Sequence, residues 1–99
     1  MAGYFILHTK WHTLDDLREY QAGAQKALRE AGARPLAYDV STEVVEGESP
    51  FPATIIIEFD SVAAAKAWYH SDAYQQVLGL RLASSDGEAR FVDSANPAR

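Results

Sequence analysis

The chain has 99 residues, a length that suits one domain and buries only about two-thirds of the surface that its unfolded form exposes. Its hydrophobic fraction of 47% and charged fraction of 23% are ordinary for a globular protein, and the absence of cysteine excludes disulfides, thiol nucleophiles and Cys-ligated metal centres. The formal net charge is −5 and the nine Lys and Arg residues are scattered, so no nucleic-acid partner is expected.

No segment of the sequence suggests export or membrane insertion. The N-terminus lacks the basic and long apolar regions of a signal peptide, and no stretch approaches the roughly 20 apolar residues that cross a bilayer. We therefore expect a cytoplasmic protein without a membrane partner.

The first third of the chain predicts a strand followed by a helix. Residues 3–12 alternate between two faces, each of which begins apolar and becomes mixed. One face carries Tyr4, Ile6, His8, Lys10 and His12, and the other carries Phe5, Leu7, Thr9 and Trp11. Thr13 and Asp16 then form a capping-box-like helix start. Apolar residues at helical spacing predict a helix over residues 14–31, which Gly32 ends.

The middle of the chain predicts a hairpin. Residues 36–46 mix aromatic and β-branched residues with polar ones and predict a long second strand, and residues 47–52 have the composition of a turn. Residues 53–59 contain three consecutive isoleucines, so both faces of this third strand should be covered. We expect this strand to lie in the centre of the sheet.

The next predicted element is a helix with an interruption. Ser61 supplies an N-cap, and apolar residues including Trp68 recur at helical spacing after it. Ser71 lies where a second cap would start a further helical stretch through Arg81. We therefore expect the helix to break near His70 and Ser71.

The C-terminal residues predict one more strand and a tail. Asp86 and Gly87 have the composition of a turn, and residues 89–93 predict a short last strand. Residues 95–99 are a polar tail, so the expected single domain spans residues 1–94.

The order strand, helix, strand, strand, helix, strand (βαββαβ) is that of a ferredoxin-like α+β fold. This order places two helices on one face of a four-stranded antiparallel sheet and leaves the other face open. The isoleucines of residues 53–59 imply that the open face is also apolar, and a large exposed apolar sheet normally packs against a partner. We expect a homodimer through the open face, with a barrel-like centre.

Short motifs along nearly the whole chain resemble one known family. The most specific segment runs from Trp68 to Arg81 and includes Trp-Tyr-His-Ser, Tyr-Gln and Leu-Arg. Further motifs are Gly-Tyr-Phe-Ile from residue 3, Glu-Tyr from residue 19, Val-Glu-Gly from residue 45 and Ile-Glu-Phe from residue 57. Together these motifs resemble the domain-of-unknown-function 1330 family of the dimeric α+β barrel superfamily.

The resemblance implies a homodimer with a pocket in each subunit, between the sheet and its helices. Relatives across the superfamily include cofactor-free monooxygenases, isomerases, polyketide cyclases, haem enzymes and stress-response proteins, whereas the family itself has no general activity. Similarity of fold does not assign roles to residues, so the role of each residue depends on its own chemistry.

His8 is the best single candidate for acid–base catalysis, because an imidazole titrates near neutrality. The alternative is a histidine that is only hydrogen-bonded or solvated. His8 and His12 lie four residues apart on one strand face, which is about 13 Å, so they cannot ligate one metal. No other metal pattern, dinucleotide loop, phosphate-binding loop or Gly-x-Ser-x-Gly motif occurs, and we expect no metal and no cofactor.

Aromatic residues of the two helices are candidates for a ligand pocket. Trp68, Tyr69 and Tyr74 surround the predicted helix break, and Tyr20 lies on the other helix. A tyrosine hydroxyl donates well to a developing oxyanion, so Tyr74 is a catalytic candidate and the other three are candidates for substrate binding. The alternative is that all four are core residues.

Two charged residues complete the candidates. The Arg81 guanidinium suits a carboxylate with two hydrogen bonds, and that carboxylate belongs either to a substrate or to an acidic residue of the same fold, namely Asp39, Glu46 or Glu58. In the first case Arg81 is catalytic. Asp39 lies on the predicted second strand, where a partly buried carboxylate would bind substrate or remove a proton next to a carbonyl. The alternative for Asp39 is a solvated strand residue.

The leading functional hypothesis is a cofactor-independent enzyme that acts on a small metabolite. An isomerase, cyclase or monooxygenase would use acid–base chemistry on an enolisable or aromatic substrate, with His8 as proton shuttle and Tyr or Arg groups stabilising an enolate-like intermediate. One alternative is a non-catalytic ligand-binding or stress-associated homodimer. The other is a haem-binding protein that uses a single histidine.

Overall fold

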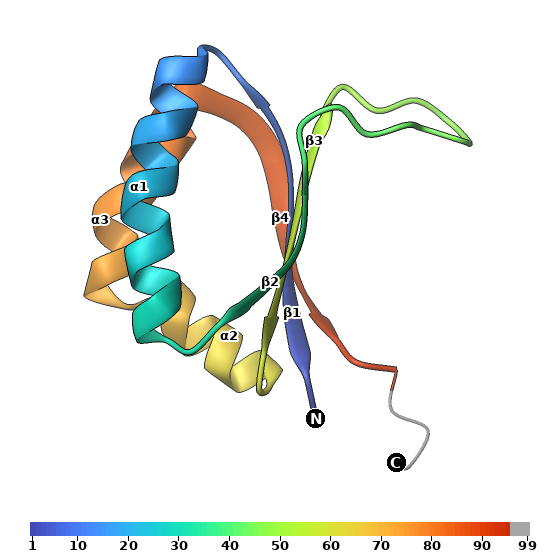
Figure 1. The fold of residues 1–99 in the computed structure, drawn as a ribbon. Helices are drawn as coiled ribbons and strands as arrows, with labels where there is room; N and C mark the ends of the chain where they lie inside the picture. The colour runs from blue at the N-terminus through green and yellow to red at the C-terminus, as the bar shows by residue number, and fades with distance from the viewer. Residues whose placement is uncertain (96–99) are drawn as a thin grey trace.

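Figure 1 shows the computed structural model, which describes residues 1–95, with its helices covering one face of an antiparallel sheet. The described elements are β1 (Gly3–Trp11), α1 (Leu14–Glu30), β2 (Arg34–Asp39), β3 (Ala53–Phe59), α2 (Val62–Tyr69), α3 (Asp72–Ser84) and β4 (Ser85–Asp93). The strand order across the sheet is β2-β3-β1-β4. The predicted ferredoxin-like βαββαβ fold is confirmed, with the second helix divided into α2 and α3. Residues 96–99 of the predicted tail lie outside the described residues.

The two faces of the sheet follow from the strict alternation of β1 and β3. Phe5 pairs with Ile57 on the helix-covered face, and Ile6 pairs with Ile56 on the open face. Phe5 is 1% exposed and Ile57 is 5% exposed, because α1 and α2 pack over them, whereas Ile6 and Ile56 are half-buried. The prediction that β3 has apolar residues on both faces, and lies inside the sheet, is confirmed.

Helix α1 starts and ends where its local chemistry requires. The Thr13 hydroxyl accepts a hydrogen bond from the Asp16 N–H and so satisfies a free donor of the first turn. After the helix, Gly32 has a φ of 68°, a left-handed conformation that glycine adopts without strain. The buried stripe of the helix is Leu17, Tyr20, Ala24, Ala27 and Leu28.

The break between α2 and α3 is confirmed at the predicted position. The Ser71 hydroxyl donates to the carbonyl oxygen of Trp68 at 2.6 Å and accepts from the N–H of Tyr74, so it ends one helix and caps the next. The rings of Trp68 and Tyr74 thereby come together, with centroids 4.1 Å apart. None of the helices within residues 1–95 has both the length and the apolar character needed to span a bilayer.

Strand β2 is shorter than predicted. It ends at Asp39, whose carboxylate accepts a hydrogen bond from the N–H of Ser41 and turns the chain out of the sheet. Residues 40–52 form an extended arm that projects beyond the open side of the sheet (Figure 1). The β-branched residues that favoured a longer strand include Val40, Val44 and Val45, and these three are exposed in the arm because they have no sheet neighbour to pack against.

Strand β4 begins four residues earlier than predicted, and the expected turn at Asp86 and Gly87 is wrong. Both residues lie inside the strand, where Gly87 pairs with Thr9. A side chain at Gly87 would collide with the backbone oxygen of His8. Glycine here permits a close approach of two strands rather than a change of chain direction.

Candidate functional site

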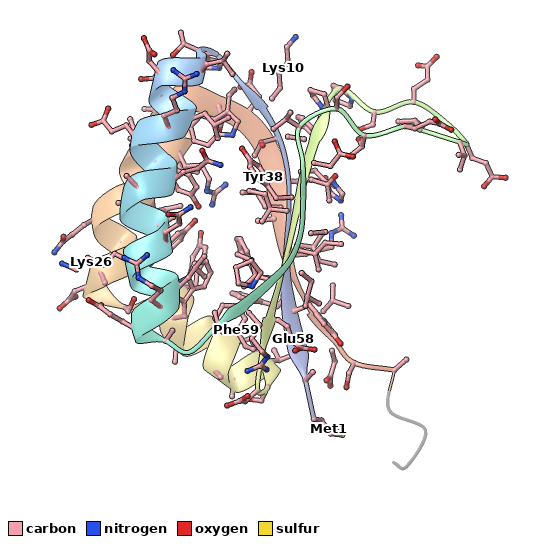
Figure 2. The ribbon with its side chains drawn as sticks, viewed as in Figure 1. Met1, Lys10, Lys26, Tyr38, Glu58 and Phe59 are labelled. Atoms are coloured by element: carbon pink, nitrogen blue, oxygen red, sulfur yellow. The ribbon has the colours of Figure 1, made fainter. Side chains whose placement is uncertain are left out.

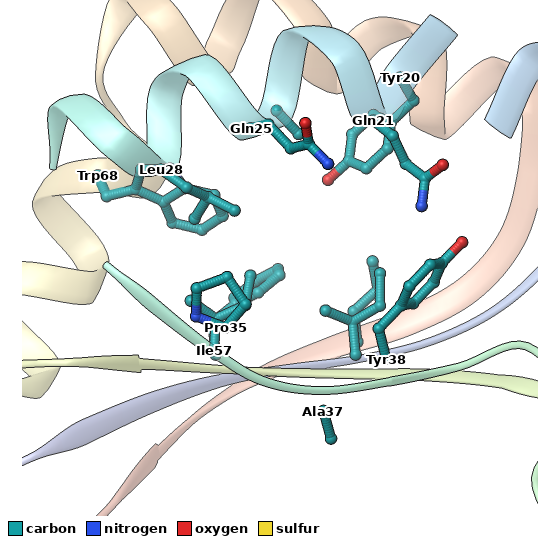
Figure 3. Close-up of a pocket in the computed structure, with 13 residues that line it drawn as sticks. Tyr20, Gln21, Gln25, Leu28, Pro35, Ala37, Tyr38, Ile57 and Trp68 are labelled. Carbon is teal, nitrogen blue, oxygen red and sulfur yellow. The ribbon is translucent and has the colours of Figure 1, made fainter. Parts of the chain in front are cut away.

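A cavity lies between α1 and the β2–β3 side of the sheet (Figure 3). Its volume is about 110 Å³ and most of its wall is apolar. Of the residues that the structure describes, those that line the cavity include no Asp, Glu, His, Lys or Arg. They are Phe5, Leu7, Tyr20, Gln21, Ala24, Gln25, Leu28, Pro35, Ala37, Tyr38, Ile55, Ile57 and Trp68.

Helix α1 forms the roof of the cavity with residues spaced one turn apart. Tyr20, Ala24 and Leu28 share one face at i, i+4 and i+8. Gln21 and Gln25 border this stripe, so uncharged amides stand where a surface helix usually carries charged residues. Figure 3 shows the side chains of Tyr20, Gln21, Gln25 and Leu28 pointing from α1 toward the sheet.

A β-bulge in β2 brings two side chains to the floor of the cavity. Pro35 pairs with Ile57 on the helix-covered face, and the register then shifts before Ala37. In an unbroken strand Tyr38 would face the opposite side from Pro35, because side chains alternate. The extra residue reverses that phase, so Tyr38 and Pro35 both face the cavity while Ala37 points away, as Figure 3 shows. Figure 2 also shows Tyr38 on the helix side of the sheet.

A buried chain of hydrogen bonds reaches the cavity from α3. The Nε of Arg81 donates to the hydroxyl of Tyr74 at 3.2 Å, and the hydroxyls of Tyr74 and Tyr20 are 2.7 Å apart. Tyr74 is completely buried, so its single hydroxyl proton needs an acceptor, and the Tyr20 oxygen is the one that the structure offers. Either hydroxyl can donate in this pair, and we orient the chain from Arg81 through Tyr74 to Tyr20 because that satisfies the proton of the more deeply buried Tyr74. This orientation leaves the Tyr20 proton as a donor at the cavity wall.

Burial keeps both tyrosines in their neutral form. Desolvation raises the pKa of Tyr20 far above its ordinary value of 10, and the neighbouring Tyr74 raises it further. Desolvation also raises the pKa of Tyr74, although Arg81 acts in the opposite direction. A tyrosine with a raised pKa is a poor base and a persistent hydrogen-bond donor. At the cavity wall Tyr20 can therefore donate a hydrogen bond to an acceptor oxygen.

Four of the seven residues proposed from the sequence come together here. Tyr20 and Trp68 line the cavity, and Tyr74 and Arg81 lie directly behind Tyr20. Tyr69 lies outside the cavity wall, half-buried against the rings of Phe5, Trp68, Tyr74 and Phe91.

The other two proposed residues, His8 and Asp39, do not line the cavity. His8 alternates with Leu7 and so lies on the open face, where its Nδ1 is 2.8 Å from the hydroxyl oxygen of Thr54. Asp39 pairs with Thr54 at the end of β2, on the same open face, and is exposed. The sheet therefore separates both residues from the cavity of their own chain.

Arg81 does not form the internal ion pair that was considered for it. Glu58 is 2.7 Å from Arg34 instead, and Asp39 caps a turn. Within residues 1–95, no carboxylate lies at ion-pair distance from the Arg81 guanidinium. Arg81 is nevertheless only 5% exposed.

The residues of the cavity do not suit haem, and residues 1–95 contain no recognisable metal centre. No cluster of three His, Cys, Asp or Glu side chains in the described part of the chain is arranged to hold a metal ion. The cavity volume of about 110 Å³ is of the order that accommodates one benzene molecule, roughly 150 Å³, and is far less than a porphyrin needs. No histidine is among the described residues that line the cavity.

Sequence reasoning missed the residues that complete the cavity. Gln21 and Gln25 carried a usable signal, because they follow Tyr20 and Ala24 along the apolar stripe of α1. Pro35 and Tyr38 carried none, because their common orientation depends on the bulge.

Comparison with solved structures finds the same fold in proteins of low sequence identity. A protein of unknown function from Rhodopseudomonas palustris gives a TM-score of 0.79 at 14% identity, over 97% of this chain and 84% of that chain. A dimeric ferredoxin-like protein of unknown function from Jannaschia sp. CCS1 gives 0.73 at 16% identity, over 95% and 100%. SnoaB, a cofactor-independent oxygenase from Streptomyces nogalater, gives 0.59 at 12% identity, over 96% and 94%. These similarities establish the ferredoxin-like fold.

Family membership follows from the sequence itself. No curated protein matches the chain. The family model for a domain of unknown function, DUF1330, matches residues 2–95 and confirms the resemblance carried by the segment from Trp68 to Arg81. The chain therefore belongs to the DUF1330 family.

Proposed function

We propose that the protein is a cofactor-independent enzyme that transforms a small apolar molecule in the cavity beneath α1. The observation that carries the proposal is the hydrogen-bond chain that ends at Tyr20, on the wall of an otherwise apolar cavity. A hydroxyl donor held in a water-poor site stabilises negative charge that develops on an oxygen atom of the substrate.

In the proposed reaction the substrate presents a carbonyl, carboxyl or enolate oxygen to Tyr20. As charge grows on that oxygen, the Tyr20 hydroxyl donates to it, while Tyr74 and Arg81 polarise that hydroxyl from behind. Isomerisation, cyclisation and oxygenation of enolisable or aromatic compounds all pass through such an enolate-like species. SnoaB, which shares the fold at 12% identity, is described as a cofactor-independent oxygenase, and this supports the oxygenase version.

The proposal limits the kind of substrate. Of the described residues that line the cavity, none is a carboxylate or an imidazole that would serve as a strong base. The substrate must therefore ionise readily by itself, as a phenol or a doubly activated C–H group does. His8 lies on the open face of the sheet, so it can act as a proton shuttle only for a substrate that binds on that face. The reaction proposed for the cavity does not use it.

Turnover by variants tests the proposal. Small phenols and carbonyl compounds would first be screened for a rise in melting temperature, and compounds that bind would be followed by oxygen consumption and mass spectrometry. With a converted compound, Tyr20→Phe should lower kcat by about 100- to 1000-fold, the loss typical of one oxyanion donor. Tyr38→Phe, which also removes a hydroxyl from the cavity wall, is the matched control. Equal losses in both variants, or none in Tyr20→Phe, would contradict the proposal.

The second candidate function is non-catalytic binding of a ligand in the same cavity. The lack of a base among the described lining residues favours this reading. It predicts that compounds raise the melting temperature and remain chemically unchanged during prolonged incubation. Conversion of any bound compound that depends on Tyr20 would exclude it.

We also propose that the protein works as a homodimer through the open face of the sheet. The centre of this face is the half-buried pair Ile6 and Ile56, and its edge carries the ion pair of Arg34 and Glu58. An apolar centre with a charged rim is the usual composition of a protein interface. The similar protein from Jannaschia is described as dimeric. Sedimentation at micromolar concentration should give twice the chain mass of 10.9 kDa, and a monomer would refute this proposal.

A further inference from the structure

Arg81 is a buried cation without a counter-ion in the described chain. Its side chain is 5% exposed, its Nε donates to a neutral tyrosine, and no carboxylate of residues 1–95 lies at ion-pair distance. Removing a charge from water is unfavourable unless an opposite charge replaces the lost hydration. A fold that needed only a donor for Tyr74 would not require a charged one.

Two buried hydrogen-bond donors beside the same tyrosines have no partner in the described chain. The indole N–H of Trp68 and that of Trp11 are buried and have no acceptor within the described residues. The Trp68 ring lies 4.1 Å from that of Tyr74, and the Trp11 ring lies 5.2 Å from that of Tyr20. An indole nitrogen can only donate. The region therefore offers one positive charge and several donors but no negative group.

The cavity connects this region to a ligand. Tyr20 lines the cavity, and two hydrogen bonds of 2.7 and 3.2 Å separate its hydroxyl from the Nε of Arg81. Trp68, with its unpartnered N–H, also belongs to the cavity wall. A negative group that accepts the Tyr20 proton would thus lie close enough to Arg81 for strong attraction in this poorly solvated site.

We propose that the ligand binds as an anion, a small carboxylic acid whose ionised group accepts the hydrogen bond of Tyr20 and balances the charge of Arg81. The remainder of the ligand fills the apolar cavity, whose volume of about 110 Å³ limits it to about one ring or a short branched chain. This inference rests on the proposed function, because it specifies the acceptor group in the same cavity.

Benzoate and its neutral analogue benzamide are the probes, because they have nearly the same shape and differ in charge. Calorimetric titration of the purified protein should show benzoate binding roughly 10- to 100-fold more tightly than benzamide, the range expected for hydrogen bonds to a charged group. In Arg81→Met this preference should disappear. The control Arg18→Met removes an exposed arginine of α1 that pairs with Asp15, and it should keep the preference.

A second measurement separates ligand binding from a structural role of Arg81. Replacing an unpaired buried charge by an apolar side chain of similar size is often neutral or stabilising, so unliganded Arg81→Met should melt at or above the temperature of the wild type. Arg81→Lys keeps the charge and should retain part of the preference for benzoate. A marked fall in the melting temperature of Arg81→Met, together with an unchanged preference for benzoate, overturns the inference.

The outcomes distinguish this inference from the proposed function. If benzamide binds as tightly as benzoate, and Ala24→Leu, which fills the cavity, abolishes both, the cavity remains the site and the anion inference is wrong. If benzoate binds with an Arg81-dependent preference that Ala24→Leu leaves unchanged, the proposed cavity site is wrong. Binding of neither compound contradicts the anion inference, whereas the proposed function is decided by the screen of phenols and carbonyl compounds.

Discussion

Replacing Tyr20 with phenylalanine removes one hydroxyl from the buried pair that it forms with Tyr74. The two oxygens are 2.7 Å apart, and the residues are 4% and 0% exposed, so water reaches the position of the lost partner only through the apolar cavity. The Tyr74 proton then has no acceptor, and an unsatisfied buried donor costs about 1–3 kcal/mol. For a domain of this size each kcal/mol lowers Tm by about 4–8 °C.

Tyr74→Phe should be more harmful than Tyr20→Phe. It removes the hydrogen-bond partner of the Tyr20 hydroxyl and also the acceptor of the Arg81 Nε–H. Because the guanidinium of Arg81 is charged, the loss of its acceptor costs more than the loss of a neutral hydrogen bond. The double variant lacks both hydroxyls, so only the Arg81 donor remains unsatisfied. The two single losses therefore should not add, and the double variant should be more stable than their sum by about 1 kcal/mol or more.

Urea unfolding followed by tryptophan fluorescence measures these free energies. All four proteins must be compared at one concentration, because the stability of a dimer depends on protein concentration. Tyr38→Phe is the control, since Tyr38 is 48% exposed, and it should change the stability by less than about 0.5 kcal/mol. Additivity within about 0.5 kcal/mol, or an order with Tyr20→Phe the worst, would refute the hydrogen-bond chain from Arg81 to Tyr20.

Three further predictions concern the strands, the titration and the interface. In thermal unfolding, Gly87→Ala should destabilise the protein by about 1–3 kcal/mol, because the new methyl group collides with the neighbouring strand. Gly79→Ala should stabilise it by up to about 1 kcal/mol, because the new methyl group points into open space and alanine favours the helix. Burial raises the pKa of Tyr20 and of Tyr74 in the folded protein, so their contribution to stability is complete below the ordinary tyrosine pKa and is lost as the pH rises above it. A pH titration followed by phenolate absorbance should therefore show that both tyrosines ionise only when the protein unfolds. Ile56→Lys should convert the dimer to a monomer in sedimentation while the circular dichroism stays native, and an unchanged mass would remove the open face as the interface.

Local sequence chemistry predicted the elements whose cause is local. Thr13, Ser61 and Ser71 start the three helices because a hydroxyl satisfies a free N–H a few residues away, without reference to the rest of the fold. The alternation of side chains along β1 is also a local property, and it correctly predicted that Phe5 and Ile6 lie on opposite faces of the sheet. One error arose where a residue serves a distant strand. Gly87 resembled a turn residue, although the strand opposite it is what requires glycine.

The candidate site depended on contacts that no local pattern encodes. Both faces of β1 begin apolar, so its alternation alone could not show that the helices cover Phe5 and leave His8 on the other side of the sheet. The bulge that turns Tyr38 into the cavity is a property of the pairing of β2 with β3.

The sequence by itself determined the order of the elements, the helix caps and the apolar stripes, because each of these depends on neighbours within one turn or one strand. Only the tertiary structure decided that Tyr20 meets Tyr74, 54 positions away, and that Arg81 lies behind them with no carboxylate of residues 1–95 at ion-pair distance. The side chains of Tyr20, Tyr74 and Arg81 come together because α1 and α3 pack against the same face of the sheet. The folded chain therefore shows that Arg81 has no counter-ion among the described residues, and its sequence alone could not show this.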